Sequence, residues 1–177
     1  MKKNQVMGLA IVAAAALFTP AISKAQDKAD NDCKKAKAAF VKADAGIKDL
    51  LTNSYGYAIF PQVTKAALIV GGAGAQGEVY EKGKQIGTAK MAQVSVGAQV
   101  GGQSYREIIF FENKEALDRF KGDNFEFSSQ VSAVAAKSGA SANANYREGV
   151  QVYTQEINGL MAEASIGGQK FTYKPLE

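Results

Sequence analysis

The sequence has 177 residues, a formal net charge of +4, one cysteine and no histidine. Without histidine, a Ser-His-Asp or Cys-His catalytic arrangement cannot form, and the usual ligand set for zinc is missing. A single cysteine excludes an intramolecular disulfide, so packing alone must stabilise the fold.

Residues 1–25 have the features of a secretory signal peptide. They combine a basic start at Lys2 and Lys3, an apolar run over Val6–Phe18 and a small-x-small cleavage pattern ending at Ala25. The alternative is a retained membrane anchor, but a membrane span needs about 20 apolar residues. We therefore expect an exported, periplasmic protein, either soluble or peripherally attached to a membrane.

Cleavage after Ala25 changes the charge balance of the protein. The segment carries three lysines and no acidic residue, so a net charge of +4 becomes +1. The mature chain has no overall basic excess of the kind that nucleic-acid binding requires. We expect no nucleic-acid partner, and any electrostatic function must come from local clusters of charge.

Residues 26–54 are predicted to form an amphipathic helix, from Asp27 to Leu51, with Gly46 as its weak point. Its apolar stripe has spacings of three and four residues: Cys33, Ala36, Phe40, Ala43, Ile47 and Leu50. One hypothesis is that this stripe packs on a sheet while the lysines face solvent. The other is that the helix lies on an anionic membrane, with Phe40 inserted shallowly and four lysines at the headgroups: Lys34, Lys35, Lys37 and Lys42.

Residues 55–177 are predicted to form a Gly-rich sheet, because nine of the 18 glycines lie between Gly71 and Gly102. Pro61 is expected to interrupt the first apolar run, after which strands follow at Ala66–Val70 and Gly77–Tyr80. The residues Glu81-Lys82-Gly83-Lys84 indicate a hairpin turn. From Met91 the pattern alternates, with Val94, Val96, Ala98 and Val100 on one face and Gln93 on the other, and a bulge is expected near Gly101-Gly102.

The remaining elements continue the same pattern. Arg106–Phe111 is a predicted strand, and Asn113 is the expected N-cap of a short helix ending at Phe120. A strand over Phe125–Val134, a loop over Ala135–Arg147 and three closing strands follow: Val150–Ile157, Leu160–Ile166 and Lys170–Tyr173. The fold class is therefore α+β: an N-terminal amphipathic helix, then a Gly-rich, mostly antiparallel twisted sheet with one inserted short helix.

Two motifs suggest chemistry but lack the context that it needs. Gly72 to Gly77 reads G-x-G-x-x-G, but a strand and a turn follow it, whereas a nucleotide site requires a helix. Glu78 and Glu81 are more typical of a solvated hairpin than of a general acid and base. Tyrosines grouped with Lys65 or Arg106 are a possible headgroup-level patch. We expect no nucleotide or other cofactor, no metal and no enzymatic activity.

From about Leu50 to Tyr173 the chain resembles the SYLF domain family, first described in yeast actin-patch proteins. The matching residues are Gly56–Pro61, Lys65–Ala67, Val70–Gly72, Gly77, Val79, Val96–Gly101, Ile108–Phe111, Asn113–Ala116, Gln130–Ala133, Val152–Thr154 and Gly159-Leu160. The resemblance implies lipid or actin binding, since eukaryotic members bind phosphoinositides with help from an N-terminal amphipathic helix. We expect neither an SH3 nor a FYVE partner domain in this chain, and the expected export signal argues against actin as its partner.

Our leading hypothesis is a non-enzymatic lipid-binding protein that associates with anionic phospholipid membranes of the bacterial envelope. The alternative is a structural or protein-interaction module of the envelope that binds other envelope proteins. The two differ in one observable, because binding driven by lysines must weaken as salt is added.

Overall fold

The computed structural model describes residues 19–66, 71–95, 103–122, 125–128, 131–158, 166 and 168–176. The helices are α1 (Thr19–Ala43), α2 (Ile47–Asn53) and α3 (Lys114–Lys121), with a 3-10 turn at Ser141–Asn143. The strands are β1 (Gly56–Ala66), β2 (Gly71–Glu81), β3 (Lys84–Ser95), β4 (Gln103–Phe111), β5 (Phe125–Glu126), β6 (Ala133–Ala135), β7 (Val150–Asn158) and β8 (Gln169–Pro175).

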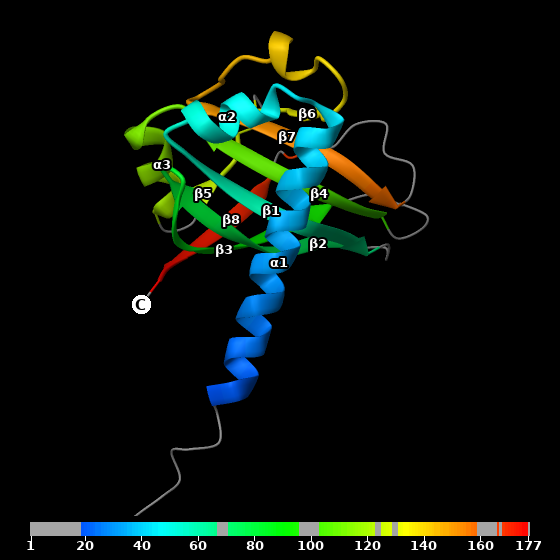
Figure 1. Ribbon diagram of the computed structural model, residues 1–177. Helices are drawn as coiled ribbons and strands as arrows, with labels where there is room; N and C mark the ends of the chain where they lie inside the picture. Colours follow the sequence, from blue (N-terminus) through cyan, green and yellow to red (C-terminus); the bar gives the residue numbers. More distant parts are fainter. Residues whose placement is uncertain are drawn as a thin grey trace, which may run out of the picture.

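All eight strands belong to one sheet, in the order β5-β8-β3-β2-β1-β4-β7-β6. Every pair is antiparallel except β6 and β7, which run parallel. The α+β class and the mostly antiparallel sheet are therefore confirmed, with one parallel pair at an edge. In Figure 1, α1 and α2 lie over one face of this sheet, and α1 extends beyond it at its N-terminal end.

The sheet curls so strongly that strands far apart in its order touch. The Gln169 side chain of β8 donates from Nε2 to Tyr105 Oη (3.3 Å) and to Glu107 Oε2 (3.0 Å) of β4. Three strands separate β8 from β4 in the sheet. The curled sheet therefore encloses an inner core of its own.

Side chains of β1 alternate between two cores on opposite faces. Ala58 and Phe60 point into the inner core, which α3 also covers. Tyr57 and Ile59 point into an outer core beneath α1 and α2. Period-two alternation places successive side chains on opposite faces of a strand, so one strand serves both cores.

The predicted N-terminal helix is two helices, because the chain turns at Asp44–Gly46. The Asp44 side chain accepts from the backbone N–H of Gly46 (3.1 Å) and of Ser141 (2.6 Å). An aspartate that binds nearby backbone N–H groups competes with the helix for them, which favours a break at this point.

The prediction that Pro61 interrupts the strand is wrong. β1 continues through it, and the register with both neighbouring strands shifts between Ile59 and Thr64. Such a bulge relaxes the requirement for a backbone N–H, so a proline fits there.

Two other strand predictions are also wrong. Gln93 is buried on the same face as Met91, because the inner core is polar where Gln169 and Glu107 meet. The strand predicted at Phe125–Val134 is two short strands at opposite edges of the sheet. Its alternating pattern suits two separate strands as well as one.

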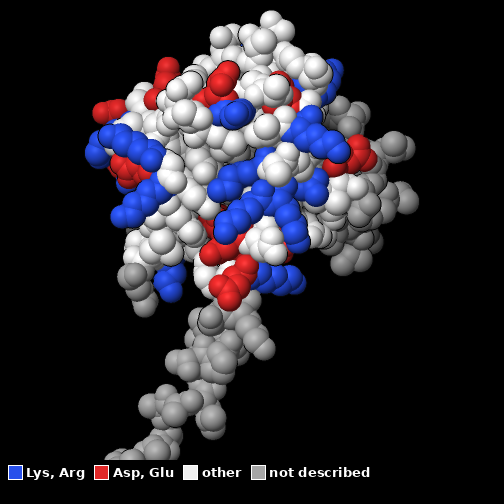
Figure 2. Space-filling view, viewed as in Figure 1, with Lys and Arg blue, Asp and Glu red and all other residues white. Residues whose placement is uncertain are grey.

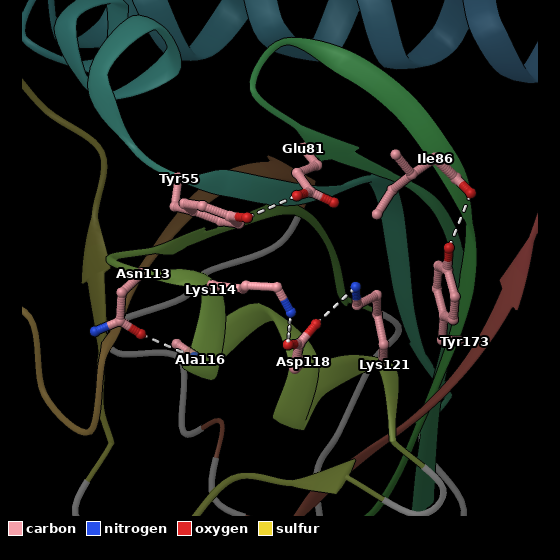
Figure 3. Close-up of polar contacts among 9 residues, drawn as sticks. All are labelled: Tyr55, Glu81, Ile86, Asn113, Lys114, Ala116, Asp118, Lys121 and Tyr173. Carbon is pink, nitrogen blue, oxygen red and sulfur yellow. Dashed lines mark hydrogen bonds and ion pairs between the residues drawn. The ribbon is translucent and has the colours of Figure 1, made fainter.

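Local signals were more reliable. The hairpin turns at Lys82-Gly83, both with positive φ, as a type I′ turn requires. Asn113 caps α3 by accepting from the Ala116 N–H at 2.9 Å, as Figure 3 shows. The same view shows Asp118 between Lys114 and Lys121.

Several predicted features lie outside the described residues. They are residues 1–18 of the predicted signal peptide, most of the strands at Ala66–Val70 and Leu160–Ile166, and the bulge near Gly101-Gly102. The predicted loop at Ala135–Arg147 contains one short 3-10 turn.

Gly77 marks a close approach of two backbones within the curl. A Cβ at this position would overlap the Ile59 carbonyl oxygen of the neighbouring strand and lie 2.7 Å from a ring carbon of Phe60. Among the described residues, the nearest neighbour of the same atom at Gly74, also on β2, would be the Met91 carbonyl oxygen at 4.0 Å. Glycine at position 77 thus permits the packing of β1 against β2.

We predict that Gly77→Ala lowers the free energy of unfolding by about 1–3 kcal/mol, the usual cost of overpacking a core. Gly74→Ala is the matched control on the same strand and should change it by less than about 0.5 kcal/mol, as for an exposed site. Urea denaturation of both variants measures the difference. Equal stability of the two variants would contradict the role given to Gly77.

Candidate functional site

Three lysines predicted to bind membranes lie on the outer surface of α1. Lys34, Lys35 and Lys42 are all exposed, and we call them the α1 basic face. In Figure 2, basic side chains gather over α1 at the centre of the view, with acidic side chains near the lower end of the helix. Among the three, Lys35 has an acidic contact, to Asp32 on the same helix at 3.9 Å.

The apolar stripe of α1 faces the sheet. Cys33, Ala36 and Phe40 are buried in the outer core, where they pack with Ile59 and Ile108. Phe40 is 0 % exposed. The expectation that Phe40 inserts into a membrane is therefore corrected, because in this fold its ring is part of the protein core.

Lys37 has a different position from the other three lysines. It is partly buried, its Nζ lies 4.0 Å from the ring centroid of Tyr80, and it donates to Tyr57 Oη at 3.3 Å. The Tyr57 and Tyr80 rings are themselves stacked, with centroids 4.6 Å apart. Burial lowers the pKa of the Lys37 amino group. Lys37 thus holds the helix on the sheet through a cation–π contact.

A buried carboxyl group lies beside this contact. Glu78 of β2 is 2 % exposed and accepts a hydrogen bond from Tyr80 Oη, and its second oxygen has no hydrogen-bond partner among the described residues. Burial raises the pKa of Glu78 above its ordinary value of 4.5, and nearby Asp30 acts in the same direction. The sequence predicts that both Glu78 and Glu81 are solvated on a hairpin. Glu78 is instead buried.

The single cysteine lies in the same interface. Cys33 is 1 % exposed, and burial raises the pKa of its thiol to about 12. A buried thiol without access to its thiolate form is chemically inert. Cys33 therefore acts as a small apolar side chain, as expected from sequence.

The turn between α1 and α2 borders a shallow groove of about 330 Å³. Its lining combines α2 with the loop after β6: Gly46, Asp49, Leu50, Asn53, Ser141 and Ala142. Burial of the Asp44 carboxyl opposes its ionisation, but backbone N–H groups, that of Ser141 first, hold its pKa below the ordinary value. Ionised Asp44 thus fixes one wall of the groove against the other.

The edge of α1 away from the Lys37–Tyr80 contact is linked to β7, and through β7 to β4. Gln155 of β7 donates from Nε2 to the Ala39 carbonyl oxygen of α1 at 3.3 Å. Arg106 of β4 donates from Nη1 to Gln155 Oε1 at 3.2 Å. The structure therefore brings Arg106 close to α1, whereas the side chain of Lys65, the other basic residue considered for such a patch, lies outside the described residues.

Within the described ranges, no group of three or more Cys, Asp or Glu side chains is placed to hold a metal ion. Over those same ranges, no helix is long and apolar enough to cross a membrane. What the described surface offers around α1 is positive charge on a helix that the sheet holds in place.

Comparison with known proteins gives the family. Residues 92–175 match the model of the family Ysc84, described as "Las17-binding protein actin regulator". Beta cell expansion factor A of Aeromonas veronii is 32% identical over 124 residues, which are 70% of this chain and 48% of the relative. The chain belongs to the SYLF (Ysc84) family.

Membership confirms the resemblance inferred from residues 50–173, and the matched segment runs from within β3 to the end of β8. It supports a domain of the lipid- or actin-binding type. The SYLF chain spans about half the length of the curated relative that it matches.

The buried Glu78 carboxyl generates a pH prediction. Because its pKa is raised in the folded protein, the folded state binds this proton more tightly than the unfolded chain does. Its stabilising effect is complete below pH 4.5 and is lost as pH rises through the raised pKa. Glu78→Gln stays neutral and keeps an acceptor for Tyr80, so we predict higher stability than wild type at pH 7 and a smaller loss between pH 4.5 and 7.

Thermal denaturation across this pH range measures the effect. Glu112→Gln, at an exposed position, is the control and should follow the wild-type curve. A Glu78→Gln protein with the wild-type pH dependence would contradict the account of this carboxyl.

Proposed function

We propose that this SYLF protein binds anionic phospholipid membranes peripherally, through the α1 basic face. The observation that carries the proposal is the arrangement of α1: its apolar stripe is buried in the outer core, and Lys34, Lys35 and Lys42 point away from the sheet. A helix that is already packed on the sheet presents its three positive charges together, so it does not have to fold when it meets a membrane.

The burial of Phe40 decides the kind of binding. With the apolar stripe in the core, attraction to lipid headgroups is the main contribution, at about 1 kcal/mol for each lysine near an anionic surface. Three lysines give roughly 3 kcal/mol, enough for reversible association only. Charges at the membrane surface are screened over a Debye length of about 10 Å at 0.1 M salt, so binding should weaken as salt is added.

We also propose that the protein is not an enzyme. The sequence lacks histidine, which supplies most general acid–base catalysis. Glu78 is buried beneath α1, where it accepts a hydrogen bond from Tyr80, and the Lys37 amino group lies over the Tyr80 ring.

A second candidate function is binding of an envelope protein at the groove between α2 and Ser141. The groove is fixed by the hydrogen bonds of Asp44 and is lined mostly by small or apolar groups. The Ysc84 family description names binding of the protein Las17, which also favours a protein partner. Binding in this groove should be insensitive to the lysine substitutions tested below.

We further propose export to the periplasm. Two features of the sequence support it: the n-region with Lys2 and Lys3, and the cleavage pattern ending at Ala25. We predict that the protein expressed in a Gram-negative host is released with the periplasmic fraction and begins at Gln26. Cell fractionation followed by intact-mass measurement tests both points, and a full-length chain retained in the cytoplasm would contradict them.

The main prediction concerns the α1 basic face. Changing Lys34, Lys35 and Lys42 together to Gln should lower partition onto phosphatidylglycerol vesicles roughly a hundredfold, the equivalent of about 3 kcal/mol. Binding of the wild-type protein should fall with added salt and be absent on phosphatidylcholine. Vesicle co-sedimentation at low and physiological salt measures these effects.

The matched control removes the same charge elsewhere. Lys84, Lys137 and Lys174 are exposed on other elements, and changing all three to Gln should leave most of the binding intact. If both triple variants lost the same amount of vesicle binding, the loss would be due to net charge alone. That result would contradict the assignment of binding to α1. No pelleting of the wild-type protein with any lipid would refute membrane binding and direct attention to the groove.

A further inference from the structure

A chain of two hydrogen bonds links Arg106 of β4, through Gln155 of β7, to a backbone carbonyl of α1. Gln155 binds the Ala39 carbonyl oxygen, and Arg106 binds Gln155 (3.3 and 3.2 Å). Lys35 and Lys42 lie four residues before and three residues after Ala39, spacings that put them on the same edge of the helix. Two lysines of α1 are therefore about one helical turn from the residue to which Gln155 links Arg106.

Arg106 is oriented by this arrangement and not neutralised by it. Its guanidinium donates to the neutral amide of Gln155, which leaves most of its five N–H donors available. Arg106, Ile108 and Phe110 alternate along β4, and the last two lie in the outer core, so Arg106 points to the α1 side of the sheet. Within the described residues, neither Arg106 nor Lys42 forms an ion pair with a carboxylate.

Among the described residues, Lys35 of this set forms an ion pair with Asp32, whose carboxylate lies 3.9 Å away and whose side chain is 43% exposed. An exposed pair at this distance contributes little, typically less than about 1 kcal/mol. The carboxylate thus compensates these three positive charges only weakly, and like charges that share a site repel one another unless an anion is bound.

We propose that Arg106, Lys35 and Lys42 form a headgroup site selective for a phosphomonoester, the terminal phosphate of a lipid such as phosphatidic acid. The planar guanidinium donates two parallel hydrogen bonds to phosphate oxygens, a geometry that an ammonium group cannot reproduce. A phosphomonoester carries up to two negative charges and three oxygens for donors, whereas the phosphodiester of phosphatidylglycerol carries one charge. Arg106 is thus the residue that gives selectivity, and the lysines supply attraction.

This site rests on the proposed membrane binding and adds a preference among anionic lipids. Attraction by the α1 basic face alone depends on surface charge density and does not distinguish headgroups of equal charge. Selectivity requires an oriented donor, and the chain of contacts from Arg106 through Gln155 to α1 supplies one.

The test compares vesicles of phosphatidylcholine mixed with phosphatidic acid or with phosphatidylglycerol, adjusted to equal zeta potential. The wild-type protein should prefer phosphatidic acid by about fivefold to tenfold in co-sedimentation, as one additional charge-assisted contact predicts. Arg106→Lys keeps the positive charge but cannot donate two parallel hydrogen bonds, so this variant should bind both kinds of vesicle equally well. Arg147→Lys, at an exposed arginine in the loop before β7, is the control and should keep the preference.

The outcomes separate this inference from the proposed function. Binding to both anionic vesicles without a preference, or a preference that survives in Arg106→Lys, overturns the site and leaves membrane binding in place. No binding to either vesicle overturns both. Circular dichroism and thermal denaturation establish that Arg106→Lys is folded, so a lost preference is assigned to the headgroup contact.

A soluble phosphomonoester could offer the same chemistry, and glycerol 3-phosphate is the probe for that source. Added as a competitor at constant ionic strength, it should displace the protein from phosphatidic acid only at millimolar concentration, because a single phosphate lacks the other attractions of the surface. Tight binding of glycerol 3-phosphate without vesicles, lost in Arg106→Lys, would assign the site to a soluble ligand and overturn its assignment to lipid.

Discussion

The packing of β1 on both of its faces is the constraint on which the rest of the structure depends. Phe60 points into the curl of the sheet, where it meets Phe171 of β8, while Ile59 points out beneath α1. The curl is possible because Gly77 lets the backbones of β1 and β2 approach closely. The outer face of the same strands is then left for α1, and burial of its apolar stripe provides the main stabilisation of the helix.

The docked position of α1 determines which of its residues can meet a ligand. Phe40 is enclosed by the outer core and Lys37 lies over Tyr80, whereas Lys34, Lys35 and Lys42 are presented to solvent. The two hypotheses for this helix are compatible, because they concern opposite sides of it. Packing on the sheet removes the apolar insertion and retains the charged surface.

Local sequence signals predicted the local structure. The Lys82-Gly83 turn and the Asn113 cap depend on residues within three or four positions, and both are confirmed. The predictions that Pro61 interrupts a strand and that Gln93 lies opposite the apolar face are wrong. The bulge at Pro61 and the polar part of the inner core at Gln93 both depend on strands distant in sequence. The resemblance carried by motifs over the sheet gave the family, although it could not give the placement of side chains around α1.

The position of Arg106 shows why sequence alone could not define the site. Arg106 reaches α1 through Gln155, 49 residues further along the chain, and Gln155 reaches Ala39 across a separation of 116 residues. No periodicity in the sequence reports contacts of this range. If α1 were not docked on the sheet, its lysines would have no fixed position relative to Arg106. Docked by Phe40 and Lys37, it holds Lys35 and Lys42 in one orientation relative to Arg106, and Gln155 of β7 orients the Arg106 guanidinium. Burial of the apolar stripe therefore fixes the positions of these positive charges relative to one another. A fixed arrangement of donors is what allows a site to distinguish one anion from another.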